Sequence, residues 1–271
     1  RVLFRSNYSE TYEFDYSYFE TENENIEEDL LNCDIYENYE EKEYIFSDID
    51  VDYNDLYNNF DNYFNEENHT KNNEYYEKIQ KIRNNPDWYN QVGWLTESTQ
   101  AKLEMYNPLV MSKMFLLNDA ALLDPFNSSH LVWVDGGLTN TVHEGYFWKD
   151  RVIPKLEKYM NKFTFVCFPY GGKQEIHGFK YEDMCRYSDD TVNKVARGGI
   201  FGGPKDLISQ MNSIYHDLLL DSLNKGLMGT EESIFTIMTY KYPELIHYYE
   251  IEENGLLNIF FESLLTRACS S

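Results

Sequence analysis

Apolar residues form two short runs that predict buried β-strands and one long stripe that predicts a helix. The runs are Leu131–Val134 and Phe163–Phe168, and polar or turn residues bound both. Short apolar runs of this kind are typical of buried parallel strands. The stripe repeats every three or four residues after Pro204 and ends near Gly226, so it predicts an amphipathic helix with one side in the core.

A second apolar helix is predicted over Pro108–Leu123, with Asn107 as the N-cap and Pro108 as the first helical residue. Lys113 lies among its apolar residues, and we expect its ammonium to reach water, with a phosphate contact as the alternative. Shorter helices are predicted at 98–105, 149–160, 233–240 and 256–265. Strands that alternate with helices predict an α/β fold, with a mostly parallel sheet flanked by helices.

Negative charge is concentrated at the front of the chain. Residues 1–78 hold 23 Asp and Glu against 5 Lys and Arg, a net charge of −18 out of −24 for the whole chain. Residues 7–78 also contain 12 of the 24 tyrosines and few aliphatic residues, so we expect an acidic, poorly structured segment. Within it, 44–51 is a predicted strand that ends in Asp48 and Asp50, which we interpret as part of a solvated linker rather than a metal site. Residues 79–271 are the predicted α/β domain.

Charge and hydropathy exclude two classes of function. Residues 79–271 carry 24 acids and 18 bases, so no basic face is available for nucleic acid. No run approaches the roughly 20 apolar residues of an integral membrane segment, and the expected compartment is the cytoplasm. Residues 1–6, RVLFRS, can be encoded by codons that match the end of a common sequencing adapter. We therefore expect them to be an artefact, and the natural N-terminus, with any targeting or anchor segment, to be missing.

Asp135 is the first candidate site residue, because it directly follows a predicted strand. Gly136 and Gly137 turn the chain there. Ligands of α/β sheets bind at the carboxyl ends of strands, where Asp135 can contact a metal ion or a ribose hydroxyl. The alternative is that it caps the next turn. His143 lies in the following loop, which can face Asp135.

The sequence RGGIFGG at Arg197–Gly203 is the second candidate. Its glycines are Gly198, Gly199, Gly202 and Gly203. Glycines this dense permit close backbone approach to a ligand, or a tight crossing of packed elements. The spacing is neither a dinucleotide fingerprint nor a phosphate-binding P-loop. Arg197 is suited to pair with a phosphate or a carboxylate.

Glu231 and Glu232 are the third candidate, at the start of a predicted helix capped by Thr230. Acids are favourable at a helix N-terminus, which alone explains both residues. The functional alternative is that one of them faces a crevice as a base or a stabilising carboxylate.

The stretch from Tyr106 to Glu262 resembles the bacterial HtrL/YibB (WlaTC) family. The resemblance lies in YNPLVMSKMFLLNDA, VWVDGGLTNTVHEGYF, FPY, EIHGF, RGGIFGG and GTEESIF. It implies a GT-A-like (Rossmann-like) fold of the nucleotide-diphospho-sugar transferases and a role in polysaccharide biosynthesis. The nucleotide-binding strand and helix that begin a GT-A domain are not clearly present in residues 7–78, so we expect the domain to be truncated at its N-terminus.

A looser resemblance links the chain to retaining glycosyltransferases of the blood-group type. These enzymes share the order of a strand-end acid, a glycine-rich loop and an acidic pair opening a helix, here Asp135, Gly198–Gly203 and Glu231–Glu232. The chain departs from them where Gly136 and Gly137 replace the usual second acid. Either Asp135 binds Mn²⁺ or Mg²⁺ with a distant partner, or Arg197 and other cations neutralise the diphosphate.

These resemblances imply a glycosyltransferase that moves a sugar from a nucleotide-diphosphate donor to a hydroxyl of a glycan or other acceptor. Glu232 or Glu231 would face the anomeric carbon, while Asp135, Arg197, His143 and the glycines would bind the donor. The alternative is a non-catalytic carbohydrate- or nucleotide-binding module of the same fold. Residues 7–78 would suit a basic partner.

Overall fold

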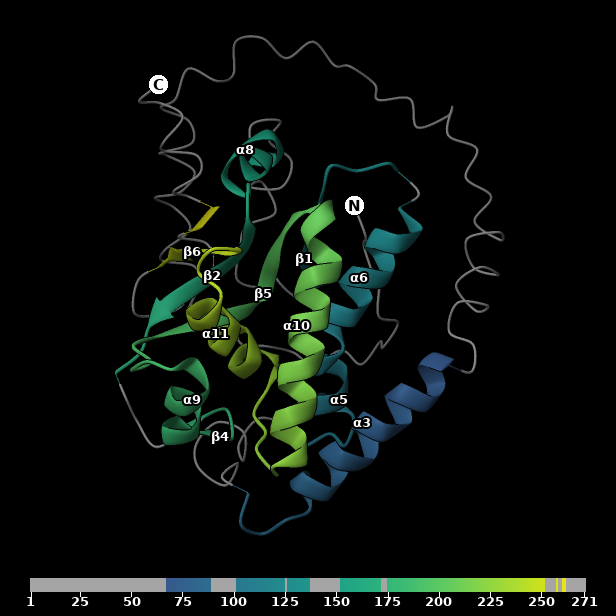
Figure 1. Cartoon of the computed structure of the whole chain (residues 1–271), viewed down its shortest axis with the longest axis vertical. Coiled ribbons are helices and arrows are strands. Elements are labelled where there is room, and N and C mark those ends of the chain that lie inside the picture. The colour runs from purple at the N-terminus through teal and green to yellow at the C-terminus, as the bar shows by residue number, and fades with distance from the viewer. Residues whose placement is uncertain are drawn as a thin grey trace, which may run out of the picture. The chain divides into compact units, whose positions relative to one another are not determined.

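A mixed four-stranded sheet organises the described part of this computed structural model (Figure 1). Its order is β1 (His130–Val134), β5 (Lys194–Pro204), β2 (Phe163–Pro169) and β6 (Ile246–Glu250). The structure describes residues 67–88, 101–124, 126–136, 152–171, 175–251, 257 and 260–261. All of them belong to one of two compact units of the chain, the one that holds Glu67–Ser271.

The strand directions correct the prediction of a mostly parallel sheet. Both predicted apolar runs are strands, β1 and β2, as expected. However, β5 pairs antiparallel with both of them, and only β2 and β6 pair in parallel. The reason is that the glycine-rich segment is not a loop: it is the body of β5, which runs between β1 and β2 in the opposite direction. The fold is mixed α/β.

Two glycines of β5 serve strand packing. A Cβ at Gly202 would lie 2.2 Å from the Leu131 carbonyl oxygen, and one at Gly203 would lie 2.8 Å from that of Lys162. Both distances are far below normal contact, so only glycine lets the backbones approach this closely. At these two positions the tight-crossing alternative is correct.

Helices precede, connect and follow the strands. They are α3 (Glu67–Arg83), α5 (Tyr106–Met111), α6 (Lys113–Leu123), α8 (Val152–Tyr159), α9 (Tyr181–Ser188), α10 (Lys205–Asn224) and α11 (Glu231–Lys241), with a small hairpin of β3 (Glu175–Ile176) and β4 (Phe179–Lys180). Helix α10 confirms the stripe predicted after Pro204, and Gly226 follows it with a left-handed φ of 72°. None of the helices in the described ranges is long and apolar enough to cross a membrane.

The predicted helix Pro108–Leu123 is two helices. The first begins at Tyr106, and the predicted N-cap, Asn107, is a buried residue inside it. Its side chain is used elsewhere, donating a hydrogen bond to the Gly229 carbonyl. Residues 101–105 form turns rather than the predicted helix, whereas 98–100, 44–51 and most of 256–265 lie outside the described residues.

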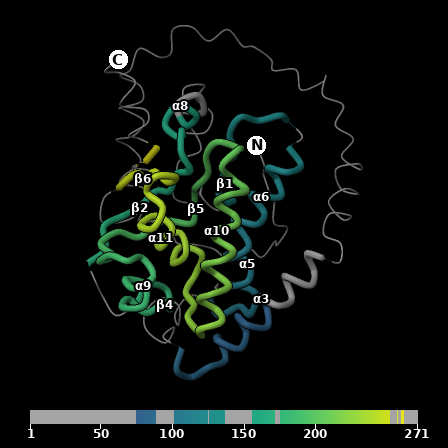
Figure 2. Tube along the Cα trace, in the orientation of Figure 1, coloured from purple at the N-terminus to yellow at the C-terminus, as the bar shows by residue number. Residues whose placement is uncertain are grey.

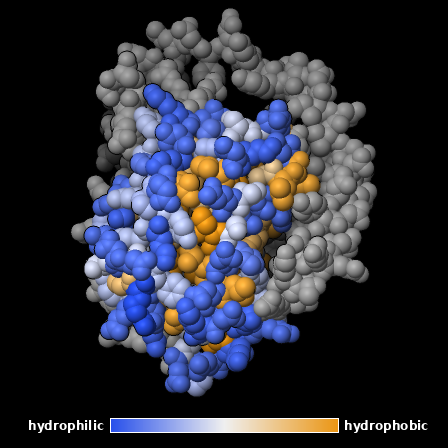
Figure 3. Space-filling view, viewed as in Figure 1, coloured by the Kyte–Doolittle hydropathy of each residue, from blue (hydrophilic) through white to orange (hydrophobic). Residues whose placement is uncertain are grey.

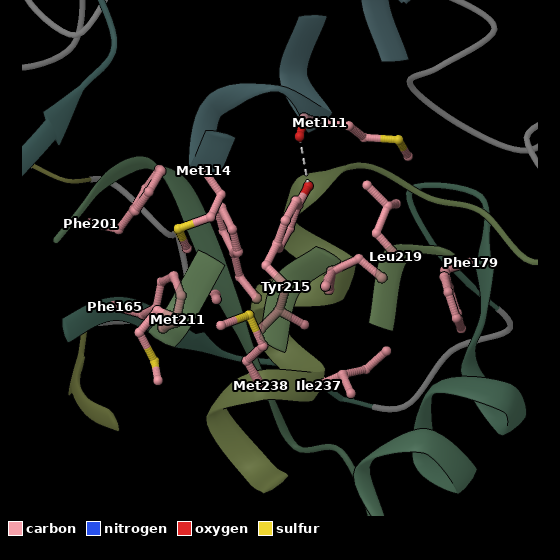
Figure 4. Close-up of a cluster of buried hydrophobic side chains, with 14 of the residues drawn as sticks. Met111, Met114, Phe165, Phe179, Phe201, Met211, Tyr215, Leu219, Ile237 and Met238 are labelled. Atoms are coloured by element: carbon pink, nitrogen blue, oxygen red, sulfur yellow. Dashed lines mark hydrogen bonds between the residues drawn. The ribbon is translucent and has the colours of Figure 1, made fainter. Parts of the chain in front are cut away.

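The main core lies between the sheet and the helices α6, α10 and α11 (Figure 4). Side chains of β2 alternate, so Phe163, Phe165 and Cys167 enter this core while Val166 joins a smaller cluster on the other face. Helices α6 and α10 lie side by side (Figure 2). Hydrophilic residues cover most of the coloured surface in Figure 3, interrupted by hydrophobic ones along α10 and beside α6.

Candidate functional site

Lys113, the first residue of α6, is the centre of a buried ionic cluster. Its ammonium donates to Asp135 Oδ2 at 2.9 Å, Glu231 Oε1 at 2.7 Å and the Gly198 carbonyl at 3.1 Å. An ammonium has three protons, and these contacts use all three. The expectation that Lys113 reaches water is wrong, because its side chain is only 11% exposed. Two carboxylates compensate for the lost hydration, which an apolar helix face alone could not do.

Asp135 lies at the rim of this cluster, directly after β1. Its N–H donates to the Gly199 carbonyl at 3.0 Å, which extends the ladder between β1 and β5. The indole N–H of Trp133 donates to Oδ1 at 2.7 Å, so the protein engages both carboxylate oxygens. The side chain is nevertheless 36% exposed. Asp135 is therefore fixed in position and still open to solvent.

Glu231, the first residue of α11, is buried against β5. A Cβ at Gly198 would lie 2.1 Å from Glu231 Oε1, so glycine is required there to make room for the carboxylate. Burial raises the pKa of Glu231 to about 7, although the neighbouring Lys113 ammonium acts in the opposite direction. This carboxyl can therefore hold or release a proton near neutral pH.

Glu232 faces a different set of groups. Its Oε1 accepts a hydrogen bond from the Gly198 N–H at 2.8 Å and lies 3.7 Å from Arg197 Nη1. Its Oε2 lies 3.2 Å from Nδ1 of His177. Burial raises the pKa of Glu232, but His177, Arg197 and the Gly198 N–H outweigh it and bring that pKa down to about 2. Glu232 is thus ionised at neutral pH.

His177 reaches Glu232 from the turn between β3 and β4. Its backbone is left-handed, with φ of 50°, a conformation that is costly for a residue other than glycine. Burial lowers the pKa of His177, yet the Glu232 carboxylate outweighs burial and raises it. The histidine is therefore a pH-sensitive member of the cluster.

The loop before α11 is held by two side chains from other elements. The Trp88 indole donates to the Met228 carbonyl at 2.9 Å, and Asn107 donates to that of Gly229, also at 2.9 Å. Arg83 in turn donates to the Asn107 side-chain oxygen. These buried contacts fix the position at which α11 begins, and with it both glutamates.

Most predicted site residues meet in this cluster. The structure brings Asp135, Arg197, Gly198, Gly199, Glu231 and Glu232 together, and an exposed Gly136 follows Asp135. Gly202 and Gly203 do not join the cluster: both pack between strands, away from the Asp135 end of β1. Gly137 and His143 lie outside the described residues.

The sequence reasoning missed several members of the cluster. Lys113 and His177 are the main ones, and Trp133 supports Asp135. Tyr106 also lies close: burial and the Glu231 and Glu232 carboxylates raise its pKa to about 12, so its hydroxyl stays protonated. A lone lysine in an apolar helix was the available signal, because such a charge requires partners when it is buried.

Comparison with known proteins identifies one family. A family model described as "Bacterial protein of unknown function (HtrL_YibB)" matches residues 49–260. The matched residues include every element from α3 to β6 and the whole cluster around Lys113. Neither the curated proteins nor the solved structures gave a match.

Proposed function

This chain belongs to the HtrL_YibB family, and we propose that it is a glycosyltransferase that moves a sugar from a nucleoside-diphosphate donor to a hydroxyl of a glycan. The observation that supports this most is the convergence of a strand-end acid, Asp135, an arginine and glycine of β5, and the two glutamates that open α11. These groups are distant in sequence and meet in one cluster, in which the side chains of Asp135 and Arg197 are 36% and 35% exposed. We extend the proposal to the GT-A superfamily on the sequence resemblance alone.

Sugar transfer requires a negative group beside the sugar and a positive group beside the diphosphate. The bond between the anomeric carbon and the β-phosphate oxygen breaks, the acceptor oxygen bonds to that carbon, and the acceptor hydroxyl loses its proton to a base. The sugar becomes more positive in the transition state while the diphosphate leaves as an anion. A carboxylate beside the sugar and a cation beside the diphosphate therefore both accelerate transfer.

Glu232 and Arg197 have the properties that these roles need. Glu232 is ionised at neutral pH, and His177 and Arg197 hold its carboxylate in place, which suits it to stabilise a positive sugar. The Arg197 side chain is 35% exposed, so its guanidinium can pair with a diphosphate. Glu231 is less suited to face the sugar, because Lys113 already pairs with its carboxylate inside the protein. Asp135, at the rim, is suited to the ribose.

The test measures release of nucleoside diphosphate from uridine, guanosine and thymidine diphosphate sugars, with and without glycan acceptors. The wild type should transfer sugar with at least one donor, and Glu232→Gln or Asp135→Asn should lower kcat/KM by about 100-fold or more. Glu182→Gln is the matched control, because Glu182 is also an acid in the first turn of a helix but is exposed on α9. Full activity of both site variants would contradict the proposal.

One observation favours a second function, a non-catalytic module that binds sugar nucleotides. The polar atoms of Lys113 and Asp135 are satisfied within the protein, as expected of a rigid recognition site. Calorimetry that detects donor binding without any release of nucleoside diphosphate would support this function over transfer.

A further inference from the structure

The sequence resemblance implies a divalent cation at the strand-end acid, but the donor set around Asp135 does not fit one. Oδ1 of Asp135 accepts a hydrogen bond from Trp133, and Oδ2 accepts one from the Lys113 ammonium. Glu231, a second acid of the cluster, is bound to the same ammonium. Within the described ranges, no three His, Cys, Asp or Glu side chains gather to hold a metal ion.

We propose that the Lys113 ammonium is the fixed cation of this site, in place of a divalent metal ion. The oxygens of Asp135, Glu231 and Gly198 lie 2.9, 2.7 and 3.1 Å from its nitrogen, so the ammonium lies at the point where a metal would share the same ligands. A metal ion and this ammonium exclude each other. Given the proposed function, it follows that the donor diphosphate binds without metal.

The charges of the cluster explain why a fixed cation is needed. The described cluster contains three acids, Asp135, Glu231 and Glu232, and two permanent cations, Lys113 and Arg197. Removing the lysine charge would leave the acids in clear excess, and they would repel a diphosphate. With the lysine paired to two of the acids and cancelling one negative charge, the exposed arginine can attract the phosphates.

Lys113 acts through its neighbours rather than on the ligand. All three of its protons are used inside the protein, and its side chain is 11% exposed. It also begins helix α6, whose positive end disfavours a cation there. The ion pairs with Asp135 and Glu231 must offset this cost, which makes Lys113 a positioning residue.

The geometry leads to a metal-binding test that does not depend on activity. Lys113→Ala would leave three oxygens around an empty position, and oxygens of this kind bind Mn²⁺ or Ca²⁺ at about 2.1–2.6 Å after small movements. The variant should therefore gain a metal site that the wild type lacks. A lysine that serves only packing would not produce such a gain.

The experiment titrates Mn²⁺ into the full-length chain, with free Mn²⁺ followed by electron paramagnetic resonance. Asp135→Asn is compared with the wild type, and Lys113→Ala/Asp135→Asn with Lys113→Ala. Loose binding to the acidic front segment is common to all four proteins and cancels within each pair. We expect the first pair to bind equal amounts, and Lys113→Ala to bind one more ion than its double variant, at least about tenfold more tightly.

Two results of the Mn²⁺ titration would contradict the proposal. A tight Mn²⁺ ion in the wild type that Asp135→Asn removes would overturn the proposal. Lys113→Ala that folds, by circular dichroism, and gains no ion would also contradict it. If Lys113→Ala does not fold, Glu231→Gln takes its place beside Asp135→Asn, and equal Mn²⁺ binding by both variants and the wild type supports the proposal.

A second experiment tests whether the donor diphosphate binds without a metal ion. Binding of uridine and guanosine diphosphate to the wild type is measured in EDTA and in Mn²⁺, and we expect dissociation constants that agree within about twofold. Binding that is about tenfold or more tighter in Mn²⁺ would overturn metal-free recognition. If neither nucleotide binds in either buffer and no donor sugar is transferred, the glycosyltransferase proposal fails, and the manganese titration alone decides the role of Lys113.

Discussion

At the scale of the residue, Gly198 determines whether the cluster can form. A methyl group there would lie 2.1 Å from Glu231 Oε1, so Gly198→Ala must push the carboxylate away from Lys113. We expect this substitution to lower the free energy of unfolding by about 1–3 kcal/mol, as for other overpacked positions. Urea denaturation measures the change.

Gly171→Ala is the control for this prediction. No atom lies within 4 Å of a Cβ built on this exposed glycine, so we expect a change within about 0.5 kcal/mol. Equal stability of the two variants would show that Glu231 moves without cost and that Gly198 is not needed for the cluster.

Glu232 makes the stability of the protein depend on acid pH. Burial raises its pKa, but His177, Arg197 and the Gly198 N–H together lower it from 4.5 to about 2. A carboxyl with a lowered pKa stabilises the folded state above pH 4.5, and this contribution is lost as the pH falls towards 2. His177, with its raised pKa, stays protonated throughout that range.

The measurement compares the wild type with Glu232→Gln in urea at several pH values. The wild type should be the more stable protein at pH 6, and its advantage should shrink steadily below pH 4.5. Glu182→Gln, at an exposed position, serves as the control, and we expect its stability difference from the wild type to change little with pH. An advantage that stays constant from pH 6 to pH 3 would contradict the assigned ion pairs.

At the scale of the element, helix α11 begins where it does because other elements hold the preceding loop. Trp88 and Asn107 donate buried hydrogen bonds to the carbonyls of Met228 and Gly229. Trp88→Phe and Asn107→Ala should each lower the free energy of unfolding by about 1–3 kcal/mol, since each leaves a buried carbonyl unpaired. Both should also speed hydrogen exchange at the first turn of α11.

The exchange readout distinguishes a local role from general destabilisation. Ser209→Ala removes an exposed hydrogen bond between α10 and Asn118, and should change stability by less than about 0.5 kcal/mol without affecting α11. If Trp88→Phe destabilises the protein but leaves exchange at Glu231 and Glu232 unchanged, the tryptophan does not position the helix.

At the scale of the whole molecule, local patterns predict elements better than they predict how elements pair. The strands at Leu131 and Phe163 and the helix after Pro204 follow from apolar periods alone. The direction of β5 does not, because glycines lack the alternating side chains that mark a strand. Gly202 and Gly203 belong to a strand only because Leu131 and Lys162 pack against them.

The candidate site, like the fold, could be predicted from the sequence only in part. The family resemblance already pointed to Asp135, Arg197 and the two glutamates, and the structure brings them together. Lys113 could not be assigned from sequence, because its partners Asp135 and Glu231 lie 22 and 118 residues away and only the tertiary fold joins them. A charge inside an apolar helix identifies a residue that needs partners, but not which partners.

The aromatic core ties the sheet to the helices that carry the site, and Phe235 is its centre. Its ring centroid lies 4.8 Å from that of Phe165, 4.7 Å from Phe201 and 5.4 Å from Tyr215, so it joins β2, β5 and α10 to α11. Phe235 also lies one helical turn after Glu231. Packing at this position therefore holds the core together and determines how deeply the Glu231 carboxylate is buried.

Phe235→Ala should lower the free energy of unfolding by about 3–5 kcal/mol, the usual cost of removing a buried aromatic ring. Phe126→Ala is the matched control, because Phe126 is 56% exposed and should cost less than about 0.5 kcal/mol. Urea unfolding is followed by tryptophan fluorescence and by far-ultraviolet circular dichroism. In Phe235→Ala the two unfolding midpoints should coincide, at a lower urea concentration than in the wild type, since the ring contacts both the sheet and the helices. Separate midpoints would mean that the sheet and α11 unfold independently, and the cluster around Lys113 would then depend on local contacts rather than on the core.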